Sequence, residues 1–233
     1  GAEVVVQPWL GYADQKNWAL DHLDFKSDWI FFLDADETIL PQLKKELCDI
    51  ASQPLTEVKQ SAFNINRYFV FLGKRIRHCG YFPSWNVRFF KRGKARYEKR
   101  NVHEHMIVDG EIGKLRGLME HNDRRGLECF LEKHNRYSTL EAKEIVSHSE
   151  DHDKTIAPKL FGNVQERRRW VKHYIYPWLP AKWLFRFVWM YGIRLGFLDG
   201  LTGFRFCLFI STYEIFITLK MIELKKQAVK HDH

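Results

Sequence analysis

Two aspartates, Asp34 and Asp36, directly follow the apolar run at residues 29–33. An apolar run of this kind, bounded by polar residues, predicts a strand that is covered on both faces. We expect the aspartates on extended backbone at the strand's C-terminal tip, where side chains two positions apart point to the same side. Ligands of open α/β sheets bind at such tips, and paired carboxylates suit a hard divalent cation that also holds phosphate oxygens.

The alternative is a purely structural one, in which Asp34 and Asp36 belong to a solvated turn that binds no ligand. Glu37, the next carboxylate, is interpreted as a turn residue that caps the following helix. The sequence alone leaves the choice between a cation site and a solvated turn open at this point.

The elements that must position these carboxylates alternate between strands and helices, which predicts an α/β fold. We expect strands at residues 4–6, 29–33, 62–72, 86–90 and 117–121, and helices from residue 14, at 41–50 and at 127–146. Two further apolar helical segments are expected at 181–198 and 204–224. The charged linker at 147–155 separates a domain of residues 1–150 from a tail of residues 151–233.

The net charge of the chain is concentrated in its final third. Residues 155–233 hold 13 Lys and Arg against 5 Asp and Glu, whereas residues 1–154 hold 24 of each. A basic tail that is rich in aromatic residues implies an anionic partner, either membrane lipid or nucleic acid. The four cysteines form no CxxC pair, which favours free thiols in a reducing compartment.

The tail helices are predicted to lie on a membrane surface. Charged residues interrupt both segments, so neither has the roughly 20 apolar residues of a spanning helix. On the first segment, a cationic face lies beside an aromatic stripe, as in helices of the lipid interface. The residues expected at the membrane are Trp183, Arg186, Phe187 and Arg194. The alternatives are two core helices that close over the sheet, and true membrane spanning.

Several motifs together make the chain resemble the family 2 glycosyltransferases of the GT-A fold, particularly lipopolysaccharide core glucosyltransferases and exopolysaccharide enzymes. The motifs are Gln15-Lys16-Asn17, Asp34-Ala35-Asp36-Glu37, Arg88-Phe89-Phe90, Val102-His103-Glu104, His121 and Gly196-Phe197-Leu198-Asp199-Gly200. The resemblance implies a GT-A sheet with helices on both faces, followed by C-terminal amphipathic helices. The opening strand-helix units of the family are absent before Gly1, so we expect a chain that lacks this front part.

The implied reaction is inverting transfer of a sugar from a nucleotide-sugar donor, a UDP-sugar, to a lipid-linked glycan, lipopolysaccharide or exopolysaccharide acceptor. Mg²⁺ or Mn²⁺ is the implied cofactor, with Asp36 as its ligand and Asp34 on the ribose or on the water shell of the metal. Lys16 and Asn17 are the implied donor-binding residues. The reaction is expected in the cytoplasm, at the inner face of the cytoplasmic membrane.

The acceptor side of the implied site is assigned to four other residues. Glu104 is the general base, and His103 orients it or contacts phosphate. Arg88 and Trp85 line the acceptor pocket, although core packing is equally open for Trp85, and Glu104 could instead pair with a nearby arginine. Zinc is disfavoured because the histidines lack a recognisable ligand spacing.

Three other functions compete with sugar transfer. The chain could be a truncated, non-catalytic module that docks on a membrane or on partner proteins. A glycoside hydrolase also needs two carboxylates, but Asp34 and Asp36 are too close in sequence to flank a scissile bond alone. Nucleic-acid binding is disfavoured, because no recognisable nucleic-acid motif accompanies the basic tail and its aromatic residues lie in helical apolar stripes.

Overall fold

The computed structural model describes residues 2–98, 105–150 and 181–231. The chain divides into two compact units. The first, called the sheet unit here, comprises Gly1–Val70 and Tyr81–Arg124, and the second, the helical unit, comprises Phe71–Gly80 and Arg125–His233. This division assigns the helix after residue 125 to the helical unit, and a domain boundary near residue 150 stays a prediction.

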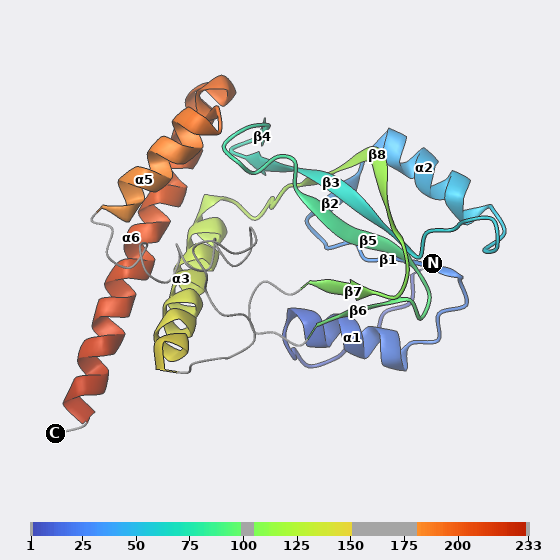
Figure 1. Ribbon diagram of the computed structural model, residues 1–233, viewed down its shortest axis with the longest axis horizontal. Helices are drawn as coiled ribbons and strands as arrows, with labels where there is room; N and C mark the ends of the chain where they lie inside the picture. The colour runs from blue at the N-terminus through green and yellow to red at the C-terminus, as the bar shows by residue number, and fades with distance from the viewer. Residues whose placement is uncertain (1, 99–104, 151–180, 232–233) are drawn as a thin grey trace, which may run out of the picture. The chain divides into compact units, whose positions relative to one another are not determined.

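The sheet unit is built on a mixed sheet with the strand order β1-β5-β3-β8-β2 (Figure 1). Its strands are β1 (Trp29–Phe31), β2 (Glu37–Ile39), β3 (Ala62–Phe71), β5 (Trp85–Lys91) and β8 (Ile112–His121), and β4 (Lys74–Ile76) pairs with β3. Only β3 and β8 run parallel among these five central strands; the other neighbours are antiparallel. A separate two-stranded ribbon joins β6 (Ala95–Tyr97) to β7 (Met106–Val108).

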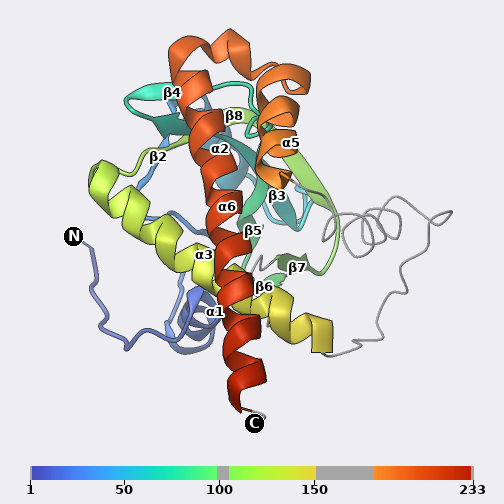
Figure 2. The same ribbon diagram turned by 90° about the vertical axis from the view of Figure 1, so that its left-hand side faces the viewer.

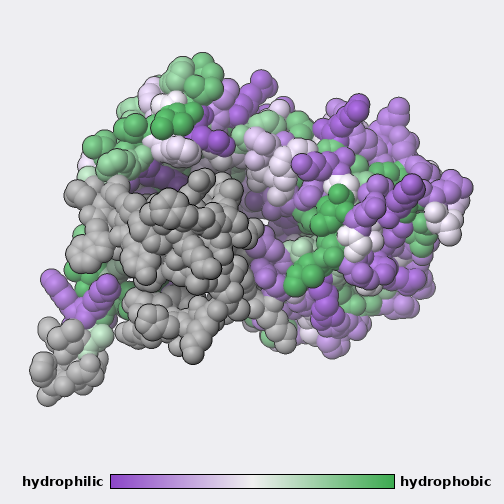
Figure 3. Space-filling view, in the orientation of Figure 1, coloured by the Kyte–Doolittle hydropathy of each residue, from purple (hydrophilic) through white to green (hydrophobic). Residues whose placement is uncertain are grey.

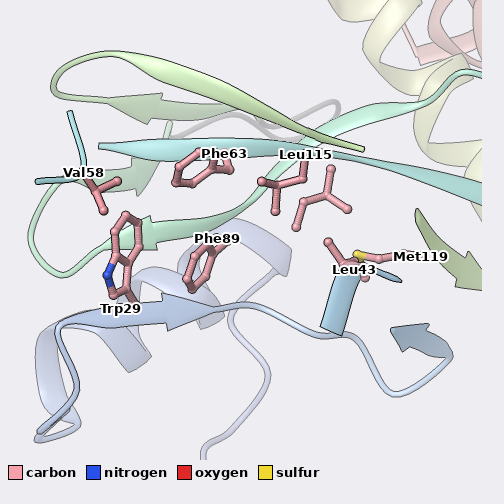
Figure 4. Close-up of a cluster of buried hydrophobic side chains, with 8 residues drawn as sticks. Trp29, Leu43, Val58, Phe63, Phe89, Leu115 and Met119 are labelled. Carbon is pink, nitrogen blue, oxygen red and sulfur yellow. The ribbon is translucent and has the colours of Figure 1, made fainter. Parts of the chain in front are cut away.

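Alternating side chains of the central strands form two apolar clusters. On one face, Trp29, Phe63 and Phe89 pack with Leu43 of α2 (Pro41–Ala51) (Figure 4). The neighbouring residues Ile30, Ala62 and Phe90 form the other cluster, which Leu20 of α1 (Tyr12–His22) joins. Because successive strand residues point to opposite faces, α1 and α2 cover different faces of the sheet. The prediction of a sheet combined with helices is confirmed, while the GT-A assignment stays a prediction.

The first ten residues differ from the prediction. Residues 2–10 form no helix or strand, and Val4 and Val6 are 84% and 90% exposed. The predicted strand at residues 4–6 is therefore wrong. No described strand pairs with this segment, and a β-branched sequence forms a strand only where a neighbour satisfies its backbone groups.

The helical unit consists of α3 (Leu127–Glu150), α5 (Lys182–Val188) and α6 (Gly200–His231). A π-helical turn, η3 (Trp189–Ile193), and a 3₁₀ turn, η4 (Gly196–Asp199), connect α5 to α6. Figure 2 shows α6 crossing α3 and running beside α5. Both predicted apolar segments are helical, but the first breaks at Leu195, whose φ of 56° is left-handed.

The break between α5 and α6 is fixed by a close approach of backbones. A Cβ atom on Gly203 would lie 2.2 Å from the carbonyl oxygen of Gly196, and a Cβ atom on Gly196 would lie 2.7 Å from that of Met190. Only glycine fits at both positions without a shift. No helix within the described residues is both long enough and apolar enough to cross a membrane.

Candidate active site

Asp34 and Asp36 lie on a tight turn between β1 and β2, which we call the carboxylate turn (residues 34–37). The backbone N–H of Glu37 donates to the carbonyl of Asp34 at 2.9 Å, and the N–H of Asp34 donates to Oε2 of Glu37 at 3.1 Å. The predicted extended backbone is therefore wrong, because β1 already ends at Phe31 and the chain turns to begin β2 at Glu37.

Asp34 is paired with two cations. Its Oδ1 lies 2.9 Å from Nζ of Lys16, and its Oδ2 accepts from Nη2 of Arg88 at 2.9 Å. Burial alone would raise the pKa of Asp34, but the charges of Arg88 and Lys16 outweigh it and hold that pKa below the usual value. Asp34 is thus an ionised carboxylate with both oxygens engaged.

Glu37 is the buried centre of the same charge network. Its side chain is fully buried, and Oε1 accepts from Nη1 of Arg67 at 2.8 Å and from Nη2 of Arg88 at 2.7 Å. The predicted role of Glu37 as a helix cap is wrong, since Glu37 begins a strand and pairs with His121 of β8. A buried carboxylate is tolerated because the two guanidinium groups compensate its charge.

Asp36 makes a different contact, with His121 at the end of β8. Its Oδ2 lies 3.6 Å from Nε2 of His121, and its side chain keeps 23% of its surface exposed. The two aspartates therefore have different surroundings: lysine and arginine around Asp34, and the last residue of β8 beside Asp36. Within the described residues, Asp34 and Glu37 each form ion pairs with arginine or lysine, whereas the ion pair of Asp36 is with His121.

The described residues contain no group of three or more His, Cys, Asp and Glu side chains placed to hold a metal ion. A magnesium-type ion does not need such a group, because one or two carboxylates with substrate phosphates and water complete its shell. Asp36 can supply such a carboxylate. Among the described residues, the carboxylate turn thus offers such an ion a single carboxylate, that of Asp36, and the rest of its shell would have to come from a phosphate-bearing substrate and water.

Lys16 and Asn17 are neighbours on α1 with different surroundings. The ammonium of Lys16, besides its pairing with Asp34, lies 5.3 Å from the ring centroid of Tyr97 and 5.8 Å from that of Phe32. Asn17 is buried, and its amide exchanges two hydrogen bonds with the backbone of Tyr97, at 2.9 and 3.0 Å. Asn17 thus anchors α1 to β6, and its predicted contact with a donor stays a prediction.

The two residues predicted at the acceptor both lie on β5. Trp85 is 39% exposed, and Nζ of Lys114 lies 5.3 Å from the centre of its ring. Arg88 is 6% exposed, and burial would lower its pKa, but Glu37 and Asp34 raise it above the ordinary value. Its buried Nη1 has no hydrogen-bond partner among the described residues. Arg88 thus belongs to the cluster of Asp34, and acceptor binding by either residue stays a prediction.

The remaining predicted site residues are either outside the described ranges or belong to the helical unit. Glu104 and His103, the predicted base and its partner, are outside the described residues. In the helical unit, Phe187 stacks on Tyr191 at 5.3 Å and meets the edge of Phe204 at 5.7 Å, so this ring packs within the unit. Trp183 and Arg194 are exposed, and Arg186 is half-buried.

Sequence reasoning missed Glu37 and Arg67 as members of the site. The available signal was the presence of arginines inside strands with buried neighbours, as in the run from Arg88 to Phe90. Charged residues are almost never fully buried unless they are paired, so an arginine inside a buried strand predicts a carboxylate partner. The partner itself cannot be identified from such a pattern.

No protein-family model matches the chain. It is 33% identical over 147 residues to the lipopolysaccharide core biosynthesis glycosyltransferase LpsC of Rhizobium meliloti. The matched region covers 60% of this chain and 51% of LpsC. Uncharacterized glycosyltransferases of Rickettsia typhi and Rickettsia prowazekii are each 27% identical over 157 residues, 63% of this chain and 52% of theirs. The chain spans about half the length of these curated relatives. The predicted resemblance to glycosyltransferases, including one of lipopolysaccharide core biosynthesis, is confirmed, and placement in family 2 stays a prediction.

Proposed function

We propose that this chain carries the carboxylate site of a glycosyltransferase that transfers a sugar from a nucleotide-sugar donor to a lipopolysaccharide or exopolysaccharide-type acceptor. The carboxylate turn is the observation that carries the proposal. It combines a fixed, doubly paired Asp34 with an Asp36 that stays available beside it. The similarity to glycosyltransferases, one of them named for lipopolysaccharide core biosynthesis, supports the class of acceptor.

Each residue of the turn has a distinct task in this proposal. A divalent ion such as Mg²⁺ or Mn²⁺, when bound, neutralises the charge of the leaving diphosphate. Asp36 provides its protein ligand. Asp34, which Arg88 and Lys16 hold in one orientation, accepts hydrogen bonds from the donor ribose or from metal-bound water. Lys16 lies next to Asp34, where a cation can also attract the donor diphosphate.

The chemistry at the sugar needs a base for the acceptor hydroxyl. We assign this role to Glu104, with His103 as the residue that orients it. Attack from the face opposite the leaving diphosphate gives inversion at the anomeric carbon. UDP-glucose is the first donor to test, because the resemblance is to glucosyltransferases.

The experiment is a donor screen with Mn²⁺ and a glycolipid acceptor, in which release of nucleoside diphosphate is measured. We expect release with a UDP-sugar, and a loss of about 10²-fold or more in the Asp36→Asn variant, because the carboxylate is the cation ligand. The matched control is Asp28→Asn, since this aspartate precedes β1 and has a side chain that is 61% exposed. Equal turnover in the Asp36 and Asp28 variants would overturn the assignment.

A glycoside hydrolase fits the carboxylate turn less well. Its general acid needs a raised pKa, whereas the pKa of Asp34 is lowered and both its oxygens are paired with cations. The non-catalytic docking module remains the second candidate, because large apolar side chains such as Ile193 and Leu201 are exposed on the helical unit. Absence of diphosphate release with every donor, together with intact folding, would favour the module.

A further inference from the structure

The turn between α5 and α6 exposes a group of large apolar side chains, which we call the apolar tip. Its six members are between 45% and 62% exposed: Trp189, Ile193, Leu195, Phe197, Leu198 and Leu201. Figure 3 shows hydrophobic side chains gathered over the end of the helical unit where α5 gives way to α6. Single exposed apolar residues are ordinary, but a contiguous group of this kind marks an interaction site.

The apolar tip is held in place from within. Met190, Gly196, Phe206 and Cys207 are buried beneath it. The carbonyl of Arg194 accepts from the N–H of Cys79 at 3.1 Å. Asp199 accepts from the backbone N–H groups of Arg77 and His78, at 3.2 and 2.8 Å. The exposed side chains thus stand on a fixed backbone rather than on a fraying end, so docking them costs little conformational entropy.

The charges around the apolar tip have one sign at the surface. Arg194 and Arg205 are exposed within or next to the tip, and Lys74, Arg75 and Arg77 are exposed on the hairpin that Asp199 binds. Asp199 is the only acidic residue between Trp189 and Arg205 in the sequence, and its side chain is 6% exposed. The surface therefore offers apolar side chains together with cations.

We propose that the apolar tip inserts into the surface of an anionic membrane, with Arg194 and Arg205 on the lipid headgroups. Tryptophan and aliphatic side chains favour the boundary between headgroups and acyl chains, and cations favour anionic lipid. A protein partner would also cover apolar side chains, but protein interfaces add directed hydrogen bonds to such contacts. The six side chains of the tip are all large and hydrophobic, which favours lipid. The tip inserts without crossing the bilayer, consistent with the lack of a spanning helix in the described ranges.

The lipid-contacting residues differ from those that helical periodicity favours. Phe187 faces Tyr191 and Phe204, so this ring is engaged inside the helical unit. The residues that reach lipid are instead those of the turn, led by Ile193, Leu198 and Leu201. Docking does not depend on sugar transfer, since it requires neither donor nor acceptor.

The test is cosedimentation of the full chain with vesicles of equal parts phosphatidylglycerol and phosphatidylcholine, and with phosphatidylcholine alone. We expect binding to the anionic vesicles and about tenfold or more weaker binding by the double variant Ile193→Asp and Leu198→Asp. The matched control is Leu219→Asp with Ile222→Asp. These residues are 58% and 47% exposed on α6, about 27 Å or more along the helix from Leu201.

The contribution of the two arginines is tested separately with the variants Arg194→Gln and Arg205→Gln. These variants should bind the anionic vesicles on the order of tenfold more weakly, and their binding should depend less on salt concentration. Light scattering in the absence of lipid tests for a second copy of the chain as the occupant. Unchanged vesicle binding by the Ile193 and Leu198 variant overturns the proposal. The proposal is also overturned if light scattering shows a dimer, and if the Ile193 and Leu198 variant is monomeric but binds vesicles as the parent protein does.

Discussion

Nη2 of Arg88 donates to Oε1 of Glu37 at 2.7 Å, and the side chain of this glutamate has no exposed surface. Because the same nitrogen also binds Asp34, one guanidinium joins the interior of the sheet unit to the carboxylate turn. The stability of the fold and the orientation of the candidate site therefore depend on the same residue.

Replacing Arg88 should destabilise the protein strongly. Among the described residues, the Arg88→Met variant leaves Arg67 as the remaining cationic contact of Glu37 and removes one partner of Asp34. Breaking a buried ion pair from one side costs about 3–5 kcal/mol, because the remaining charge is poorly compensated. Urea unfolding at neutral pH measures this loss in the free energy of unfolding.

The matched control is Arg67→Met, since Arg67 binds the same carboxylate oxygen from a side chain that is 30% exposed. Water can replace part of its interaction, so we expect a smaller loss than for Arg88. A loss in Arg67→Met as large as that in Arg88→Met would contradict the central place of Arg88.

Asp34 should make stability depend on acidic pH. Its pKa is lowered from 3.8, since the charges of Arg88 and Lys16 outweigh burial. A carboxylate with a lowered pKa in the folded state stabilises that state fully above its unfolded pKa, and this contribution disappears as the pH falls through the folded value. In Asp34→Asn, the free energy of unfolding should be lower at neutral pH and should fall less steeply below about pH 4.

The measurement is urea unfolding across the acidic range, with Asp28→Asn as the control for an exposed aspartate near the same strand. Identical pH profiles for the Asp34 and Asp28 variants would show that the pairing with Arg88 and Lys16 adds nothing to the folded state.

Asn17 should contribute to stability through its two hydrogen bonds to the backbone of Tyr97. In Asn17→Ala the half-buried N–H and carbonyl of Tyr97 lose these partners, which costs about 1–3 kcal/mol. Thermal unfolding followed by circular dichroism measures this cost. Gln15→Ala is the control, because Gln15 lies on the same helix and makes one exposed hydrogen bond, at 3.4 Å. Equal melting temperatures for the two variants would argue against the anchor.

His134 should make the helical unit less stable as the pH falls below neutrality. Burial lowers the pKa of His134 from 6.5, and nearby Lys133 lowers it further, although the carbonyl of Phe130 at 2.7 Å acts in the opposite direction. The unfolded chain therefore binds a proton at a higher pH than the folded chain does. The free energy of unfolding should decrease as the pH falls from about 6.5 through the lowered pKa.

Replacing His134 by Leu removes the titrating imidazole. The free energy of unfolding should then depend less on pH between about 6.5 and the lowered pKa of His134. The control is His105→Gln, since the His105 side chain is exposed. If the His134 variant kept the slope of the parent protein, titration of this histidine could not be its origin.

Local patterns in the sequence predict most of the sheet unit. The helix that begins at Pro41 follows from its leucine stripe and from proline at its first position. The strands around Ile30, Phe63 and Phe89 follow from dense β-branched and aromatic residues. The strand predicted at residues 4–6 has a similar composition but pairs with none of the described strands, and composition alone does not reveal whether a partner strand exists.

The candidate site is less accessible to this reasoning. Asp34 and Asp36 stand out as candidate site residues in the sequence because they directly follow an apolar strand. Glu37 resembles a surface residue in the sequence, since its partners Arg67 and Arg88 lie 30 and 51 residues away. Its burial is decided by the pairing of β2 with β8, which is a long-range event that no local pattern encodes.

The hydrogen bonds of Asp199 to the backbone of Arg77 and His78 join segments that are more than 120 residues apart. During synthesis, at about 5–20 residues per second, residues 71–80 leave the ribosome on the order of ten seconds before their partners exist. Phe71 can meet Phe130 once α3 has been made, but its contact with Phe206 is missing during that interval. The helical unit therefore cannot be completed until residues 199–206 have been made, after the described strands of the sheet unit.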